Sequence, residues 1–218
     1  MNILGVSCYY HDAAAALLMD GNLVAAAEEE RFTRKKHDSS YPKNAISFVQ
    51  SMRGLRRADL DYVVFYENRW SNLNVSCKPP WAPFPNRGGS GESMVTWFDE
   101  KLWIKSKLHT ELNVPASKIL FVEHHLSHAA SAMFCAPFAD AAVVTIDGVG
   151  EWTTSTIGKA TAQWNGEGKN HIELTRELRF PHSLGLLYSA FTAYLGFRVN
   201  NGEYKVMGMA SRRAKIPG

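Results

Sequence analysis

The stretch that decides the fold runs from His124 to Glu151 and reads HHLSHAASAMFCAPFADAAVVTIDGVGE. Small and apolar residues over Leu126–Cys135 predict a helix, and this helix has to end before Pro137 because proline cannot continue it. The apolar run Ala141–Ile146 then predicts a buried strand. We therefore expect the polar residues of this stretch to lie on one helix and at the end of one strand.

Three of these polar residues predict a metal site. His124 and His128 are four residues apart and so share one helical face, which lets two imidazoles bind one ion as they do in HExxH motifs. Asp147 follows the predicted strand beside Gly148 and Gly150, where a metal or phosphate contact is natural. Two histidines and one aspartate form a facial set with open positions, which suits Fe(II) better than a closed structural zinc site.

Each part of this pattern also has a simpler interpretation. The histidines alone are compatible with a partly exposed or capping pair, and Asp147-Gly148 alone is compatible with a hairpin turn. A zincin-type peptidase is not expected, because His125 stands where HExxH places its general base, a glutamate. The combination of histidine pair, helix, strand and Asp-Gly within one short stretch favours a functional site.

Composition excludes several classes of protein. The 218 residues are 45% hydrophobic and 21% charged, which is typical of a soluble globular protein. A formal net charge of +3 is too small to predict nucleic-acid binding, and the three cysteines show no paired spacing, so we expect reduced thiols in the cytoplasm. The chain begins without a basic leader, and no apolar run approaches roughly 20 residues, so we expect neither a signal peptide nor a membrane span.

The chain repeats one plan of strands. Ile3–Ser7, Ala13–Met19 and Leu23–Glu28 predict three strands, the last two joined by a turn at Asp20-Gly21. The segment from Val143 to Leu178 repeats this plan, with strands at Thr153–Ile157 and Ile172–Leu178. A duplicated three-stranded meander leading into helices predicts the α/β class with an actin-like, sugar-kinase-like (ribonuclease H-like) fold. We expect a first lobe over residues 1–138 and the start of a second over 139–218.

The remaining segments predict further elements in the same order. Helices are expected from Pro42, over Ser93–Leu108 and from Phe180 to Leu195, the last with Ser183 as N-cap; strands are expected at Tyr62–Tyr66 and Ile119–Val122. The irregular segment Asn68–Gly91 is expected to be an insertion. The charged segment Glu28–Asp38 reads as a solvated loop, whose Arg31, Lys35 and Lys36 could bind an anionic ligand.

Six long motifs in this order resemble a known family: HDAAAALLMDG, AEEERFTRKKHD, HHLSHAASA, TIDGVGEWTT, FPHSLGLLYSAFTAYLGF and GEYKVMGMA. The family is that of the nodulation-factor and antibiotic O-carbamoyltransferases. The helix with HxxxH is also similar to the metal-binding helix of tRNA threonylcarbamoyl transferases. The resemblance implies that a synthase-like module makes carbamoyl-adenylate from carbamoyl phosphate and ATP. The actin-like module then transfers the carbamoyl group to a hydroxyl of a small molecule or sugar, at a site that holds iron.

The resemblance also implies roles for individual residues. His124, His128 and Asp147 fall on the metal positions, with a further aspartate ligand of the family beyond Gly218. His11 and Lys36 match positions near the carbamoyl-adenylate. Beyond the resemblance, Arg31, Gly148 and Gly150 are also expected to contact this intermediate. His11 and His125 are candidates for the base that takes the acceptor proton.

The chain departs from the family after GEYKVMGMA, where members continue and this sequence reads Ser211–Gly218. The expectation is a fragment, a truncated gene product or half of a split enzyme, without transfer activity by itself. Exposed apolar residues around Leu186, Leu187, Phe191 and Leu195 would then promote a homo-oligomer or bind a missing C-terminal half. The alternatives are an inactive ligand-binding subunit and a phosphotransferase of the same fold, which would use acidic Mg²⁺ ligands and no HxxxH.

Overall fold

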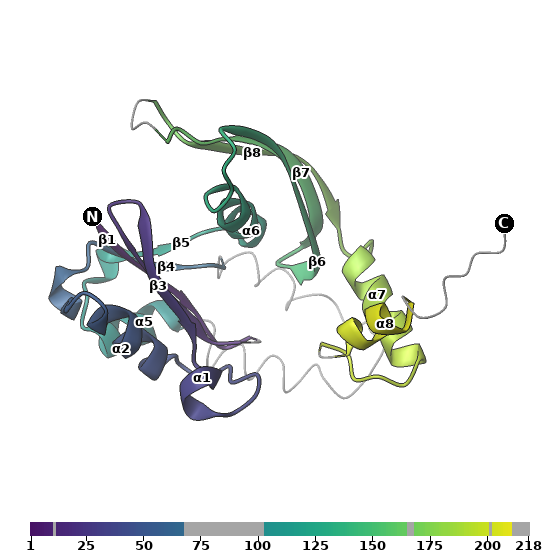
Figure 1. The fold of residues 1–218 in the computed structure, drawn as a ribbon, viewed down its shortest axis with the longest axis horizontal. Helices are drawn as coiled ribbons and strands as arrows, with labels where there is room; N and C mark the ends of the chain where they lie inside the picture. The colour runs from purple at the N-terminus through teal and green to yellow at the C-terminus, as the bar shows by residue number, and fades with distance from the viewer. Residues whose placement is uncertain (11, 68–102, 165–167, 201, 211–218) are drawn as a thin grey trace. The chain divides into compact units, whose positions relative to one another are not determined.

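The computed structural model describes residues 1–10, 12–67, 103–164, 168–200 and 202–210 (Figure 1). The chain forms two compact units, Met1–Glu123 and His124–Gly218. The sequence placed the boundary between residues 138 and 139. In the structure the helix that begins at His124 belongs to the second unit, because it packs on that unit's sheet.

The first unit is built on a five-stranded mixed sheet with the order β3-β2-β1-β4-β5. The predicted meander is confirmed: β1 pairs antiparallel with β2, β2 with β3, and Asp20 and Gly21 both take positive φ in the turn. β1 and β5 lie parallel to β4, as crossover connections require. The strands are β1 (Asn2–Ser7), β2 (Ala14–Met19), β3 (Asn22–Glu28), β4 (Tyr62–Phe65) and β5 (Ile119–Phe121).

Helices cover this sheet and complete its core. They are α1 (Glu30–Thr33), α2 (Lys43–Ser51) and α5 (Ile104–Leu112), with short 3₁₀ turns η1 (Arg57–Asp59) and η3 (Ala116–Lys118). Leu4, Leu17, Phe65 and Leu108 are among the fully buried core side chains. The segment Glu28–Asp38, predicted as a solvated loop, contains the one-turn helix α1. The predicted insertion and the first ten residues of the helix predicted over Ser93–Leu108 lie outside the described residues.

Glu29 anchors the start of α2 from the end of the preceding meander. Its buried carboxylate accepts hydrogen bonds from Asn44 N (3.2 Å), Asn44 Nδ2 (2.6 Å) and Ala45 N (2.8 Å). Pro42, at the N-cap position, provides no side-chain cap. Glu29 therefore satisfies backbone N–H groups that have no partner within the helix, and its charge is favourable at a helix N-terminus.

We expect Glu29→Gln to lower the free energy of unfolding by about 1–3 kcal/mol, because an amide nitrogen replaces one accepting oxygen in a buried site. Urea unfolding measures this change. Glu28→Gln is the matched control, because the Glu28 side chain is 46% exposed and bonds only the exposed Arg31 among the contacts described. The control should stay within about 0.5 kcal/mol of wild type; equal losses in both variants would contradict the capping role.

The second unit is a three-stranded antiparallel sheet with the order β6-β7-β8, with helices packed against it. Along β6, Val143 and Thr145 are buried on one face while Val144 and Ile146 are exposed on the other, as the period of a strand requires. The elements are β6 (Asp140–Gly150), β7 (Thr153–Thr161), β8 (His171–Arg179), α6 (His124–Met133), α7 (Leu184–Tyr194) and α8 (Glu203–Ala210).

This unit confirms the predicted repeat of the meander, and with it the α/β class. β6 continues beyond the predicted end at Ile146, and its pairing with β7 shifts register between Ile146 and Gly150. The turn itself lies at Glu151, which takes a positive φ of 62°. Asp147 therefore lies in an irregular part of a strand before the hairpin turn. Ser183 is the N-cap of α7, as predicted, because its side chain accepts from Leu186 N.

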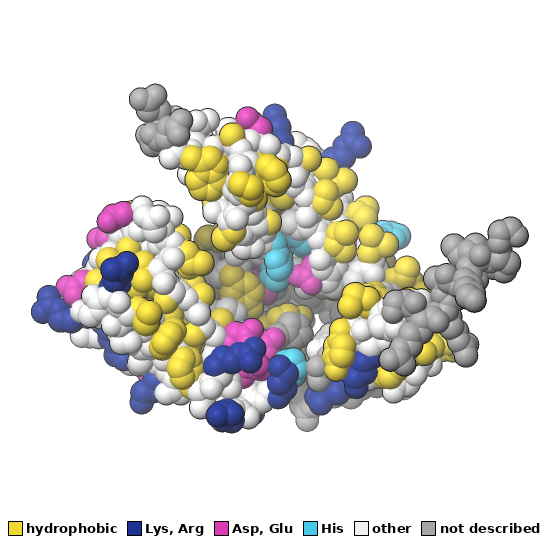
Figure 2. Space-filling view, viewed as in Figure 1, with side chains coloured by type: hydrophobic (Ala, Val, Ile, Leu, Met, Phe, Trp, Pro, Cys, Tyr) yellow, Lys and Arg dark blue, Asp and Glu magenta, His cyan; other side chains and the backbone are white. Residues whose placement is uncertain are grey.

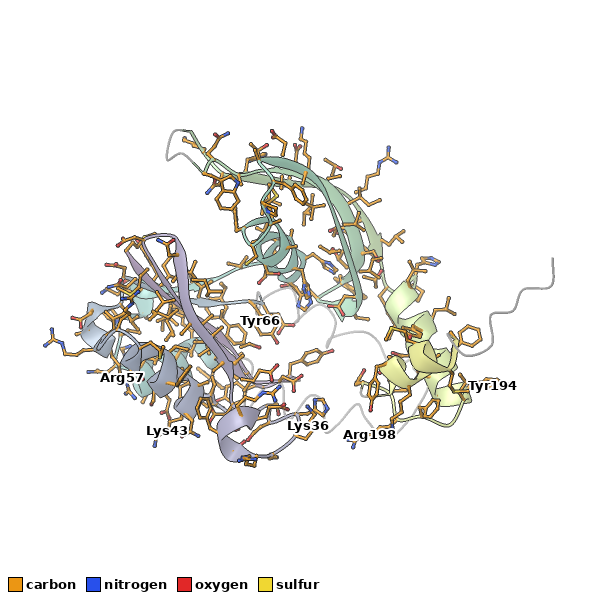
Figure 3. All side chains as sticks on the ribbon, in the orientation of Figure 1. Lys36, Lys43, Arg57, Tyr66, Tyr194 and Arg198 are labelled. Carbon is orange, nitrogen blue, oxygen red and sulfur yellow. The ribbon has the colours of Figure 1, made fainter. Side chains whose placement is uncertain are left out.

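α7 carries exposed apolar side chains on the second unit. Leu187 is 54% exposed, Phe191 56% and Tyr194 85%, and Tyr194 lies at the end of the helix (Figure 3). Figure 2 shows hydrophobic side chains on the surface of this unit as well. The exposure agrees with the predicted apolar face, and self-association through it stays a prediction. Within the described part of the chain, every helix is too short or too polar to cross a bilayer.

Candidate metal centre

Three side chains from α6 and β6 meet in the second unit. His124 Nε2 lies 2.6 Å from Asp147 Oδ2 and 3.0 Å from His128 Nε2. His128 Nε2 lies 3.5 Å from the same carboxylate oxygen. The structure thus brings together all three residues that the sequence predicted as ligands, with their donor atoms within 4.8 Å of one another.

Local geometry explains this arrangement. Residues four apart on α6 project on the same side of the helix, so His124 and His128 stand one turn apart. α6 packs on the face of the sheet that carries Val143 and Thr145, and Asp147 is the next residue of that alternation. The four-residue spacing on α6 and the alternation along β6 therefore bring the two histidines and Asp147 together.

The distances between donor atoms fit a divalent metal. Metal–nitrogen bonds of about 2.0–2.1 Å place two ligands that stand at right angles about 3 Å apart. The 3.0 Å between the two imidazole nitrogens and the 3.5 Å from His128 to Asp147 match this spacing, while the 2.6 Å from His124 to Asp147 is a hydrogen bond. Two imidazoles with one carboxylate form the donor set of a first-row transition metal.

The carboxylate of Asp147 is held at both oxygens. Oδ1 accepts from the backbone N–H of Gly148 (2.6 Å), and Oδ2 faces the two histidines. Hydrogen bonds from His124 and then His128 hold the pKa of Asp147 well below its usual range, against the opposing effect of burial. Asp147 is therefore an anion throughout the physiological range, as a metal ligand must be.

The backbone around Asp147 is tied to the start of α7. Ser183 Oγ lies 3.1 Å from the carbonyl oxygen of Asp147 and 2.6 Å from that of Gly148. Gly185 lies so close that a Cβ at this position would be 2.5 Å from the Asp147 carbonyl oxygen. The first turn of α7 therefore supports the irregular part of β6, and only glycine fits at residue 185.

His125 points into the unit and bonds the sheet. Its Nδ1 lies 2.6 Å from Thr145 Oγ1, and its Nε2 lies 2.8 Å from the carbonyl oxygen of Thr153. Burial lowers the pKa of this imidazole. Both ring nitrogens are engaged with protein atoms, so the geometry favours a supporting role over the general-base role predicted for His125.

The two predicted glycines contact the ligand set directly. The N–H of Gly148 donates to Asp147, and Gly150 packs against the ring of His124. A Cβ at Gly150 would lie 2.8 Å from both Cγ and Nε2 of His124, and closer still to Cδ2. Both glycines thus shape the ligands, and their contact with carbamoyl-adenylate stays a prediction.

Comparison with known proteins now identifies the family. Residues 2–214 match the family described as Carbamoyltransferase N-terminus. The chain belongs to this family. The resemblance drawn from the six sequence motifs is therefore confirmed.

Two relatives illustrate the similarity. The chain is 48% identical over 218 residues to the uncharacterized protein sll1178 of Synechocystis sp., covering 96% of this chain and 34% of that protein. It is 34% identical over 206 residues to the nodulation protein NolNO of Sinorhizobium fredii, covering 93% of this chain and 28% of that protein. The chain thus spans about a third of the length of these relatives.

Among solved structures, the chain is similar to YeaZ from Pseudomonas aeruginosa. The TM-score is 0.40 at 14% sequence identity, and the match covers 83% of this chain and 69% of that one. A second structure, a protein with similarity to peptidase YeaZ from the same organism, gives a TM-score of 0.36 at 13% identity, over 98% and 93% of the two chains.

The basic residues predicted to bind carbamoyl-adenylate lie in the first unit and are ion-paired. Lys36 Nζ lies 3.0 Å from Glu30 Oε1, and Arg31 lies 3.1 Å from Glu28. Lys36 projects from the segment that follows α1 (Figure 3). Both side chains are 69% exposed, and their contact with carbamoyl-adenylate stays a prediction. His11 lies outside the described residues.

A second group with metal-ligand chemistry lies in the same unit, formed by Asp12, Glu30 and His37. His37 Nδ1 contacts Asp12 Oδ1 at 3.0 Å, and Glu30 accepts from Lys36 and from the backbone of His37. These hydrogen bonds and the ion pair between Lys36 and Glu30 explain why the three side chains lie close together, and no metal ion is needed for it.

Sequence reasoning missed several residues that support the candidate metal centre. Thr145 hydrogen-bonds both His125 and Thr156. Gly185 lets α7 approach Asp147. Two signals were available. A threonine in an apolar strand two residues before Asp147 shares its face, and a glycine in the first turn of a helix indicates a close approach.

The lowered pKa of Asp147 predicts how stability of the metal-free chain depends on pH. A depressed pKa in the folded state contributes stability above the unfolded value of about 3.9, and this contribution is lost as pH falls below it. Asp147→Asn should therefore be less stable than wild type at pH 7. Its free energy of unfolding should also fall less steeply than that of wild type below about pH 4. Urea unfolding at several pH values tests this, with Asp140→Asn at the exposed end of the same strand as control. An unchanged acid decline in Asp147→Asn would contradict the prediction.

Proposed function

We propose that this chain supplies the metal-binding part of an O-carbamoyltransferase. The reaction transfers a carbamoyl group from carbamoyl-adenylate, made from carbamoyl phosphate and ATP, to a hydroxyl of a small molecule or sugar. The observation that carries the proposal is the convergence of His124, His128 and Asp147 in a chain of the carbamoyltransferase family. His124 Nε2, His128 Nε2 and Asp147 Oδ2 would hold Fe(II) or another divalent metal.

The chemistry assigns a task to each group. In the transfer, the acceptor oxygen forms a bond to the carbamoyl carbon, the bond from that carbon to the phosphate oxygen breaks, and AMP leaves. When bound, the metal supplies Lewis acidity toward a carbamoyl or phosphate oxygen. Asp147 contributes a fixed negative charge, and the paired histidines provide neutral nitrogen donors. Lys36 and Arg31 offer positive charge to the adenylate phosphate.

The acceptor hydroxyl must lose a proton as its oxygen attacks. His124 and His128 would be engaged as ligands, and both nitrogens of His125 bond protein atoms. Among the residues that the sequence predicted as base, His11 is therefore the one we propose. His11→Gln should lower kcat at neutral pH while metal binding is retained.

The donor set also separates this proposal from the phosphotransferase alternative. Mg²⁺ prefers oxygen ligands in octahedral geometry, whereas two of the three donors here are imidazole nitrogens. Metal content measured after anaerobic loading with Fe(II), Zn²⁺ or Mg²⁺ distinguishes the two. Selective retention of Mg²⁺ would overturn the carbamoyltransferase metal site.

The transfer assay uses the protein encoded by the full reading frame of the gene, with the 218-residue chain assayed beside it. Metal-loaded protein receives carbamoyl-adenylate and a panel of hydroxyl acceptors, and carbamate and AMP are measured by mass spectrometry. We expect turnover by the full product that requires both metal and His128. Full turnover by His128→Ala, or by metal-free protein, would contradict the proposal.

A further inference from the structure

α6 carries one polar residue on a face that is otherwise apolar and buried. His125, Ala129 and Met133 follow at intervals of four and are 5%, 0% and 3% exposed. Ala129 and Met133 pack against Val143 and other apolar side chains of the sheet. A leucine in place of His125 would bury more apolar surface, so the imidazole has to contribute something other than packing.

The hydrogen bonds of His125 have one consistent direction. The carbonyl oxygen of Thr153 can only accept, so Nε2 of the buried neutral ring carries the proton and donates to it. Nδ1 then accepts, and the hydroxyl of Thr145 donates to it at 2.6 Å. Thr145 Oγ1, having used its proton, accepts from Thr156 Oγ1 at 2.6 Å. The chain of bonds runs from β7 through β6 to α6 and back to β7.

Two neighbouring residues of α6 form hydrogen bonds with two nearby residues of β6. His125 bonds Thr145, and the adjacent His124 bonds Asp147, two residues further along the same face of β6. Apolar packing by Ala129 and Met133 tolerates small rotations of the helix, whereas directional hydrogen bonds do not. A metal site tolerates only about 0.2 Å of error in its ligand distances.

From this geometry we infer that His125 is a positioning residue, which with Thr145 and Thr156 fixes the rotation of α6 and so aims His124 and His128 at the metal. The inference rests on the proposed metal site. It assigns His125 no contact with substrate or metal. Removing outer-shell partners of metal ligands typically costs about 10–100-fold in affinity, and we expect a loss in this range.

The test uses Co(II) as the probe with the 218-residue chain under anaerobic conditions. Thr145→Val removes the hydroxyl but keeps the shape, Thr145→Ser restores the hydroxyl, and His125→Leu removes the imidazole. Thr175→Val, on the exposed side of β8, is the matched control. Co(II) affinity and the Co(II) absorption spectrum are measured on the folded chain, with urea unfolding beside them. Long-range ¹H–¹⁵N spectra of the metal-free chain report the tautomer of His125.

We expect Thr145→Val to weaken Co(II) binding about 10–100-fold and alter the spectrum, with Thr145→Ser near wild type and Thr175→Val unchanged. Folded Thr145→Val with wild-type affinity and spectrum would overturn the inference, and so would an Nδ1-protonated His125 in the wild type. Should His125→Leu fail to fold, the threonine variants decide. Failure of the metal site itself appears differently, as wild type without Co(II) binding or His128→Ala with unchanged binding, and the inference then fails with it.

Discussion

Gly150→Ala is expected to weaken metal binding strongly although residue 150 donates no ligand atom. A methyl group there would lie 2.8 Å from two ring atoms of His124 and closer to a third, inside any normal contact distance. His124 is buried between α6 and β6, so its ring cannot move aside without displacing Nε2 from Asp147. We expect metal affinity to fall by 10-fold or more and the free energy of unfolding by about 1–3 kcal/mol.

Gly148→Ala is the matched control for this change. A methyl group at residue 148 would meet only Leu186 Cδ2, at an ordinary contact distance of 3.8 Å, and the backbone N–H that bonds Asp147 is retained. Neither glycine takes a positive φ, so the comparison isolates the contact with His124. Metal titration and urea unfolding of both variants measure the difference. Equal affinities for metal would show that the packing of His124 does not determine the site.

His128→Ala is expected to reduce metal affinity by at least 10-fold with little effect on stability. The imidazole would supply one of the donor atoms, and losing a ligand should cost at least as much as the loss of about 10–100-fold typical of removing an outer-shell partner. Its side chain is 53% exposed, so the free energy of unfolding should change by about 0.5 kcal/mol or less. This variant therefore tests metal affinity without a large change in the stability of the fold.

Two further histidine variants make the result specific. His171→Ala, on the exposed start of β8, removes an imidazole that pairs across β7 with the Asp140 end of β6, away from Asp147, and should leave metal content unchanged. His124→Ala should lose both affinity and stability, because His124 is only 7% exposed and bonds Asp147. Equal metal content in wild type, His124→Ala and His128→Ala would refute the site.

Local patterns were sufficient for much of the fold. The Asp20-Gly21 turn, the strands of both meanders and the N-cap at Ser183 were predicted from neighbouring residues, because turn chemistry, strand alternation and capping depend on the local chain. Strand ends were less accurate: β6 reaches Gly150 beyond the predicted Ile146. Its last residues pair with β7 across a register shift, and such pairing depends on the partner strand.

The sequence by itself determined which residues form the candidate site. Four-residue spacing puts His124 and His128 on one side of any helix, and an aspartate after an apolar strand falls at its end, whatever the rest of the chain does. Only the tertiary structure decided that α6 packs on β6, that His125 bonds the sheet, and that Gly150 makes room for His124. These contacts join residues about twenty or more positions apart, and they depend on helix rotation and close packing, which no local spacing fixes.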